Sequence, residues 1–240
     1  MENVLYIALS RQEAMRRQMD VVANNIANMN TTGFKSQRPL FLEYLERPDR
    51  RQERMSFVQD YGLMRNLQAG PVTVTDNPLD VALRSDGYFT VETLAGPRYT
   101  RAGGFQLNTD RELVDRNGLP VLSDAGARIV IPDGANQIRI QGDGSIETEQ
   151  GPLARLKVVS FDDEQKMQEL GGGLYSTEQE ERPVEKPEIT QGALEGSNVQ
   201  PIVETTQMID VLRAYQNTQR MIDSEHERLR TAIRQLGRVQ

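Results

Sequence analysis

Residues 5–29, LYIALSRQEAMRRQMDVVANNIANM, place apolar side chains at alternating steps of three and four. This is the spacing of a coiled-coil seam, a narrow stripe along one side of a helix, rather than of a broad globular face. The stretch therefore predicts a long N-terminal helix, from about Asn3 to about Asn30, that needs a partner to cover its stripe. The seam positions are Leu5, Ala8, Gln12, Met15, Met19, Val22, Ile26 and Met29, of which only Gln12 is polar.

The other end of the chain repeats this rhythm. Residues 208–236, MIDVLRAYQNTQRMIDSEHERLRTAIRQL, predict a second seam with two polar interruptions. Since each helix has only a narrow stripe to bury, the simplest partner of either helix is the other. We therefore predict that the termini pair and that everything between them is an insertion. The second seam comprises Met208, Leu212, Tyr215, Gln219, Ile222, His226, Leu229, Ile233 and Leu236.

Three asparagines near the end of the first helix have two interpretations. Asn24 and Asn28 are predicted on its outer face, one turn apart, while Asn25 borders the seam. They form either a polar surface that frays easily or a set of amides that hydrogen-bond to neighbouring helices in a packed assembly.

The ends of both helices carry recognisable signals. Gly33 follows the first helix, at a place where glycine accepts the left-handed conformation. Pro201 is predicted to open the second helix, because N–H groups in the first turn lack intrahelical partners anyway. Asn198 or Gln200 would then be the N-cap.

Between the helices, the pattern changes to short alternating strands separated by turn residues. Residues 71–176 predict an all-β domain, a sandwich or partly closed barrel, with one short helical interruption within 162–170. The pair Asn117-Gly118 is the strongest hairpin signal, because both residues tolerate the positive φ of a type I′ turn.

The predicted fold class is α+β, with a discontinuous helical domain formed by residues 1–35 and 197–240 and an inserted all-β domain. Residues 36–70 are interpreted as a connector with a short amphipathic piece. Residues 177–196, rich in Glu and containing two prolines, are interpreted as a return linker.

A basic cluster in the connector has two interpretations. Its arginines either form a solvated loop or pair, within or between subunits, with an acidic stretch near the return linker. The cluster is Arg47, Arg50, Arg51 and Arg54, and the acidic stretch is Glu178, Glu180, Glu181 and Glu185.

Composition narrows the classes of function. The net charge of −7 argues against nucleic-acid binding, and the absence of cysteine removes disulfides, zinc thiolates and thiol nucleophiles. The first residues have no basic region and no cleavage site, so we expect no cleaved signal peptide. No apolar run approaches the ~20 residues that span a bilayer.

No constellation of residues predicts chemistry. His226 is the single histidine, and no serine is placed to form a catalytic triad with it. Asp223, His226 and Glu227 share one helix face, but a polar residue in a seam more often sets register than binds metal. The glycines at 171–173 lack the Lys-Ser/Thr of a phosphate-binding loop. We therefore predict no enzyme activity and no catalytic, cofactor-binding or metal-binding residue.

Several segments resemble one family of proteins. The run NNIANMNTTGFK at 24–35, together with NPLDVAL at 77–83, YTRAGGF at 99–105 and LEGSNV at 194–199, is similar to the bacterial flagellar rod and hook family. The residues that carry this signature are Gly33, Phe34, Asn77, Pro78, Leu79, Asp80 and Asn198. The short length resembles most the F-type proximal-rod branch, and the distal-rod branch is the alternative.

The resemblance implies a structural subunit that self-assembles through its terminal helices and helps to transmit torque from the motor to the hook. Its implied partners are copies of itself, other rod proteins and the flagellar export apparatus, with no nucleic acid and no small-molecule substrate. Its implied location is the basal-body rod that crosses the periplasm, reached without a cleaved signal. The expected assembly interface comprises Leu5, Met15, Met19, Val22, Asn24, Asn25, Ile26, Asn28, Met208, Leu212, Tyr215, Ile222, Leu229, Ile233 and Leu236.

A different class of function fits the same composition. In that alternative, the helices form a closed stalk that presents the β domain of a soluble binding module to a ligand. A fixed small oligomer would favour this module, whereas open-ended growth would favour the rod.

Overall fold

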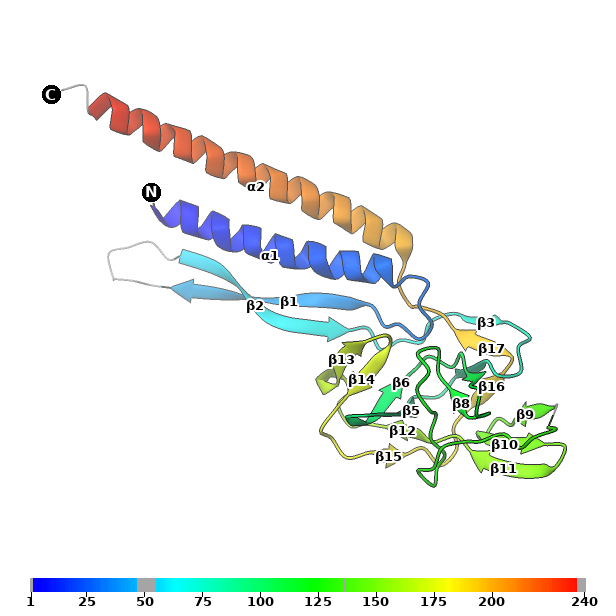
Figure 1. Ribbon diagram of the computed structural model, residues 1–240. Coiled ribbons are helices and arrows are strands. Elements are labelled where there is room, and N and C mark those ends of the chain that lie inside the picture. Colours follow the sequence, from blue (N-terminus) through cyan, green and yellow to red (C-terminus); the bar gives the residue numbers. More distant parts are fainter. Residues whose placement is uncertain (1, 47–54, 136, 237–240) are drawn as a thin grey trace. The chain divides into compact units, whose positions relative to one another are not determined.

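The two ends of the chain form one structural unit in the computed structural model, which describes residues 2–46, 55–135 and 137–236 (Figure 1). The chain divides into a helical unit, residues 1–27, 37–66 and 200–240, and a β unit, residues 28–36 and 67–199. The predicted α+β class, with helices at both termini and a β-rich insertion, is confirmed.

The helical unit is built from α1 (Glu2–Ala27), α2 (Pro201–Leu236) and a hairpin of β1 (Gln37–Glu46) and β2 (Met55–Arg65). Figure 1 shows α1 between α2 and the hairpin. The helices are antiparallel, since Gln12 Nε2 donates to Gln219 Oε1 at 2.5 Å and Asn25 Nδ2 to Glu204 Oε2 at 3.1 Å. The predicted pairing of the two terminal helices is thus confirmed.

The stretch 36–70, interpreted as a connector, contains the two longest strands of the described chain. Their antiparallel register runs from Gln37 opposite Arg65 to Glu46 opposite Met55, with an irregularity between Leu40 and Phe41. The alternation that marks a strand is hidden in this sequence, because consecutive residues such as Leu40, Phe41 and Leu42 are all apolar. The arginine cluster between the two strands lies outside the described residues.

The helix ends differ slightly from the predictions. Helix α1 ends at Ala27 rather than near Asn30, so Met29 is an exposed residue beyond the helix and not a seam residue. Gly33 has φ +70°, and a Cβ there would lie 2.6 Å from the carbonyl carbon of Arg101. Gln200 immediately precedes α2, whereas the side chain of Asn198 accepts from the Ser36 N–H at 2.7 Å and donates to Gln68 O at 2.9 Å. Asn198 is therefore not the N-cap.

The β unit is a set of small antiparallel sheets. The largest has the strand order β13-β14-β6-β5-β12-β15, a second has the order β11-β10-β9, and three pairs are β16-β4, β17-β3 and β7-β8. The strands are β3 (Val72–Val74), β4 (Val81–Leu83), β5 (Tyr88–Thr93), β6 (Gly96–Thr100), β7 (Gln106–Leu107), β8 (Leu113–Val114), β9 (Ile138–Ile140), β10 (Ser145–Thr148), β11 (Gly151–Arg155), β12 (Val158–Ser160), β13 (Gln168–Gly171), β14 (Leu174–Ser176), β15 (Arg182–Pro183), β16 (Ile189–Gln191) and β17 (Ala193–Glu195).

Three local features of the β unit bear on the predictions. The expected helical interruption is a single 3₁₀ turn, Glu164–Lys166. The stretch 177–196, interpreted as a linker, supplies β15, β16 and β17. The Asn117-Gly118 turn exists with Gly118 at φ +80°, but Asn117 keeps an ordinary φ. The carboxylate of Asp115 closes this turn by accepting from the N–H groups of Asn117 and Leu119, both at 2.8 Å.

Two apolar clusters fill the β unit. The larger cluster includes the fully buried Val81, Phe89 and Val121. The smaller is mainly aromatic and includes Tyr99, whose ring lies edge-on to Phe161 with centroids 4.7 Å apart. The Tyr99 hydroxyl donates to Glu181 Oε1 at 2.8 Å.

A buried carboxylate ties distant segments of the β unit together. Glu195, only 1% exposed, accepts from Lys35 Nζ at 2.6 Å, Arg101 Nε at 3.0 Å and the Gly70 N–H at 3.0 Å. The guanidinium of Arg101 also donates to backbone carbonyls, among them Gly87 O at 2.6 Å. Burial lowers the pKa of Lys35 below its ordinary value, while the hydrogen bond and charge of Glu195 oppose this shift. Each buried charge of this cluster is neutralised only when Glu195, Lys35 and Arg101 are all in place.

Glu195→Gln is expected to destabilise the β unit by about 3–5 kcal/mol, because two buried cations lose their shared counter-charge. Urea unfolding followed by near-UV circular dichroism of the tyrosines measures the change. Glu188→Gln is the matched control, since Glu188 is exposed in the same unit. Its effect should stay within about 0.5 kcal/mol, and equal unfolding midpoints for the two variants would contradict the role given to Glu195.

Tyr99 predicts an alkaline dependence of stability. Burial, followed by the hydrogen bond and charge of Glu181, raises the pKa of Tyr99 above its ordinary value. The folded chain therefore keeps this proton after the unfolded chain has lost it, so the stabilisation is complete below about pH 10 and declines as pH rises further. Urea unfolding of the wild type and Tyr99→Phe between pH 8 and 11 should show a stability difference that shrinks above about pH 10. Parallel curves over this range would contradict the assignment.

Candidate assembly surface

The seam between the helices contains most of the predicted residues of α1. Ala8, Met15 and Val22 are buried, and Leu5, Met19 and Ile26 are half-buried. The hairpin contacts another side of α1, where the Val58 N–H donates to Ser10 Oγ and Arg17 pairs with Asp60. Helix α1 is therefore covered on two sides.

The seam of α2 differs in part from the prediction. Met208, Tyr215 and Ile222 are half-buried at predicted positions. Val211 is buried where Leu212 was expected, and Thr218 is buried beside Gln219, which is half-buried and accepts from Gln12 of α1. Leu212 is exposed, and so is His226. Placing Glu204 in the seam, by its hydrogen bond to Asn25, sets a register whose steps of four and three lead to 208, 211, 215 and 218. The prediction that Leu212 and His226 lie in the seam is wrong.

Asn25 fixes this register from inside the helical unit. Its amide is 1% exposed and donates to both Glu204 Oε2 and Gln37 O, while its oxygen accepts from the Gln37 N–H at 2.9 Å. Asn24 is exposed, and Asn28 Oδ1 accepts from the Thr31 hydroxyl at 3.1 Å. Asn25 thus bonds to the other helix and to the hairpin of its own chain.

Within the described residues, the last turns of α2 lie beyond the start of α1 and have no partner helix. Helix α2 has 36 residues against 26 in α1, and the antiparallel register places the start of α1 level with about Arg228. Figure 1 shows α2 extending beyond α1 at the end where both termini lie. Leu229 and Ile233 continue the seam rhythm there but are 37% and 68% exposed. The side chain of Leu236 is outside the described part of the chain.

Further apolar side chains are exposed elsewhere on the helical unit. The first half of α2 exposes Ile202 and Ile209, and β1 exposes Leu40, Leu42 and Tyr44 on alternate residues. Exposed apolar patches on one unit indicate contacts with other protein surfaces. Sequence reasoning missed the patch on β1, because it gave residues 36–70 a short amphipathic piece and no strand.

The signature residues serve the local structure of the β unit. Phe34 is buried, and Asp80 accepts from the Thr75 hydroxyl at 2.7 Å. The Asn77 side chain accepts from the Leu79 N–H at 3.3 Å, and Pro78, between them, is exposed. Gly33, as described above, approaches the backbone of Arg101 closely. These residues shape turns and close contacts rather than a site with chemistry.

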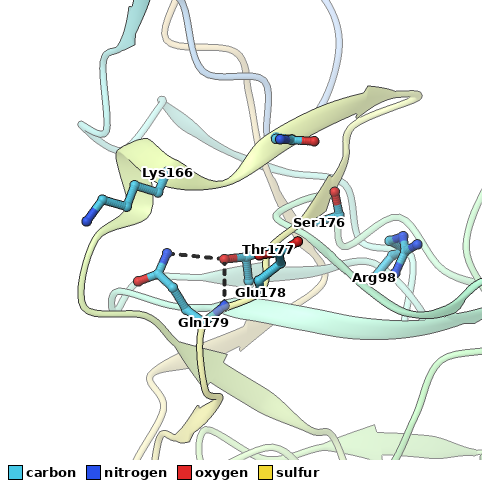
Figure 2. Close-up of a pocket in the computed structure, with 7 residues that line it drawn as sticks. Arg98, Lys166, Ser176, Thr177, Glu178 and Gln179 are labelled. Carbon is cyan, nitrogen blue, oxygen red and sulfur yellow. Dashed lines mark hydrogen bonds between the residues drawn. The ribbon is translucent and has the colours of Figure 1, made fainter.

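A polar pocket lies in the β unit between β13, β14 and the chain that follows them (Figure 2). Two cations, Arg98 and Lys166, line it together with Glu178. Figure 2 shows the side-chain amide and backbone N–H of Gln179 both donating to Thr177 Oγ1, at 3.1 and 3.2 Å. Its lining residues, Arg98, Lys166, Gln168, Ser176, Thr177, Glu178 and Gln179, include no nucleophile paired with a base.

The described residues form neither a cluster of metal ligands nor a membrane-spanning helix. Within residues 2–46, 55–135 and 137–236, no three acidic or histidine side chains are grouped to hold a metal ion. Neither helix in that part of the chain combines the length and apolar character required to span a membrane.

The acidic stretch that was expected to meet the arginine cluster includes Glu181. Its carboxylate accepts from the Tyr99 hydroxyl and pairs with Lys157.

Three family models match the chain in order. Residues 5–35 match "Flagella basal body rod protein", residues 82–148 match "Flagellar hook protein FlgE/F/G D1 domain", and residues 190–235 match "Flagellar basal body rod FlgEFG protein C-terminal". The first and third matches cover most of the two terminal helices, and the second covers part of the β unit.

Curated relatives match over nearly the whole chain. A flagellar basal-body rod protein FlgF of Caulobacter vibrioides is 38% identical over 244 residues, covering 100% of both chains. A FlgF of Rhizobium meliloti is 33% identical, covering 99% of both chains. A flagellar basal-body rod protein FlgG of Agrobacterium fabrum is 33% identical, covering 93% of this chain and 95% of its own. With these full-length similarities and the paired terminal helices, the chain belongs to the flagellar basal-body rod protein family.

Proposed function

We propose that this chain is a structural subunit of the proximal rod of the bacterial flagellum, where it helps to transmit torque from the motor to the hook. The observation that carries the proposal is its full-length similarity to relatives named FlgF. The proposed role involves no catalysis, no nucleic acid and no small-molecule substrate.

The helical unit is the proposed site of assembly with copies of the chain and with other rod proteins. Its two helices bury a narrow seam and leave apolar side chains exposed on α2 and on β1. A helix pair with so little buried surface gains stability when neighbouring subunits cover the remainder. We therefore propose that the interface comprises exposed residues such as Leu212, Leu229 and Ile233, while Met15 and Val22 hold the helices together.

We also propose a route by which the subunit reaches the rod. Membership in the rod implies export by the flagellar export apparatus without a cleaved signal, followed by incorporation where the rod crosses the periplasm. This part of the proposal rests on the family resemblance.

A distal-rod subunit is the second candidate, favoured by the 33% identity to a FlgG over 93% of the chain. A closed stalk on a soluble binding module accounts less well for the apolar residues that α2 leaves exposed.

Deleting the gene from its own bacterium tests the proposed function. Loss of swimming, with basal bodies that end below the hook, is the expected result, and the wild-type gene should restore both. Normal swimming and complete basal bodies without the gene would overturn the proposal. Restoring the deletion with the bacterium's own distal-rod gene would favour the second candidate.

Asn25→Ala tests whether the paired helices are required. It removes the hydrogen bonds that the buried Glu204 and the backbone of Gln37 make with Asn25, which should destabilise the helical unit by about 1–3 kcal/mol and reduce swimming in the complemented strain. Asp20→Ala is the matched control, because Asp20 is an exposed polar residue of α1. Thermal unfolding followed by circular dichroism at 222 nm measures the loss, and equal effects of the two substitutions would contradict the role of Asn25.

The isolated chain should show unequal protection from amide exchange. Helices α1 and α2 are expected to exchange quickly in the monomer, since they await neighbours, while the β unit stays protected. Hydrogen exchange followed by mass spectrometry checks this, and uniform protection would contradict it.

A further inference from the structure

The turn after β8 contains the one asparagine-glycine pair of the chain, Asn117-Gly118. Both residues are exposed, so water reaches them. Glycine has no side chain, so its backbone nitrogen approaches a neighbouring group more closely than that of any other residue. This pair is therefore the place in the chain where a backbone nitrogen most readily attacks the side-chain amide of the residue before it.

Such an attack deamidates the asparagine in two steps. In the first step, the Gly118 nitrogen loses its proton and bonds to Cγ of Asn117, while the bond from Cγ to Nδ2 breaks and the amide nitrogen leaves with a proton as ammonia. In the second step, water opens the resulting five-membered ring at either of its two carbonyl carbons. The products are aspartate and isoaspartate at position 117, and water is the only co-reactant.

The folded turn opposes the first step, because Asp115 holds both reacting groups. The Gly118 N–H donates to the Asp115 carbonyl oxygen at 3.0 Å. Asn117 Nδ2 donates to Asp115 Oδ2 at 3.1 Å and to Gly172 O at 3.4 Å. Asp115 itself is only 4% exposed, so the core of the β unit fixes its position. The attacking nitrogen and the leaving amide must both break these bonds before the reaction.

We propose that Asn117 is a site of deamidation that the folded β unit suppresses through Asp115. In the folded chain, Asn117 reacts only during the fraction of time for which the turn is open. In the unfolded chain these bonds are absent, and the reaction proceeds without this restraint. The inference does not depend on the role of the chain in the rod.

The products are expected to prevent the turn from closing again. Aspartate at position 117 places an oxygen where Nδ2 donates to Asp115 Oδ2 and Gly172 O, and it adds a negative charge beside the buried carboxylate of Asp115. Isoaspartate lengthens the backbone between the N–H groups of residues 117 and 119, which Asp115 Oδ1 binds together. A chain that reacts while unfolded would therefore fold into a less stable β unit.

Incubating the full chain in water enriched in heavy oxygen measures the reaction, because each deamidation adds one heavy oxygen to the new carboxyl group. Mass spectrometry of the peptide that contains residue 117 then gives the rate. Labelling should be about tenfold slower in the folded chain than in urea, since opening the turn costs about two hydrogen bonds. Equal rates would overturn the proposal.

Asn77 is an internal control within the same chain. The residue after it is Pro78, which has no backbone N–H with which to attack. Position 77 should therefore stay unlabelled both in the folded chain and in urea. Labelling there at the rate of position 117 would show a reaction that does not use the following nitrogen, and it would overturn the proposal.

Two variants separate protection by Asp115 from general stability. Asp115→Asn keeps an oxygen for the N–H groups of Asn117 and Leu119 but loses one carboxylate oxygen, so the folded variant should label several-fold faster than the wild type. Ile146→Val is the matched control, because it weakens the core of the same unit away from the turn. It should label at the wild-type rate, and equal labelling of the two variants would overturn the role of Asp115.

Asn117→Asp tests the effect of the product and does not require Asp115→Asn to fold. It should unfold at a lower urea concentration than Asn117→Ala, which removes the same amide without adding a charge. Near-UV circular dichroism of the tyrosines follows the unfolding. Equal midpoints for Asn117→Asp and Asn117→Ala would overturn the proposed effect of the product.

Discussion

The carboxylate of Glu195 is the interaction on which the β unit depends. It binds Lys35, which lies just before β1, the N–H of Gly70, which precedes β3, and Arg101, which follows β6. These segments are far apart in the sequence. A buried ion cluster of this kind contributes less by net free energy than by excluding alternatives, because any other arrangement leaves a charge buried without a partner. Asn198 adds neutral hydrogen bonds to the same segments through Ser36 and Gln68.

The helical unit has a comparable constraint in Asn25. Its amide joins Glu204 of α2 to Gln37 of β1, so one side chain fixes both the register of the helices and the start of the hairpin. The two polar anchors differ in chemistry. The one in the β unit is ionic, whereas the one in the helical unit joins an amide to a carboxylate and a peptide group. In each case, a buried polar group selects one arrangement of the segments around it, and apolar contacts alone would leave that arrangement open.

The sequence was sufficient to predict the two helices, their pairing and the β insertion, because each follows from periodicity that residues such as Met15, Val22 and Tyr215 display locally. It was not sufficient to choose between Val211 and Leu212 for the seam, since a rhythm of threes and fours fits either residue. That choice depends on the bond between Asn25 and Glu204, which are remote in sequence.

The strands that sequence reasoning missed are those without a local signal. The hairpin is apolar on consecutive residues, and β15 to β17 are two or three residues long in a segment rich in Glu and Pro. Such strands exist because a partner elsewhere in the chain offers a free edge, as β4 does for β16 and β3 does for β17. For the assembly surface, the exposed residues at the end of α2 could be identified as part of a seam. That no described helix lies beside them depends on the unequal lengths of α1 and α2.

The position of β17 near the end of the β unit governs when that unit can form. A chain that emerges from the ribosome or from a narrow channel with its N-terminus first exposes Lys35 and Arg101 long before Glu195 follows. Until then, β3 has no β17 to pair with, and closing the fold would bury two positive charges with no negative charge between them. The order of residues thus makes closure of the β unit depend on a strand and a charge that only its last part supplies.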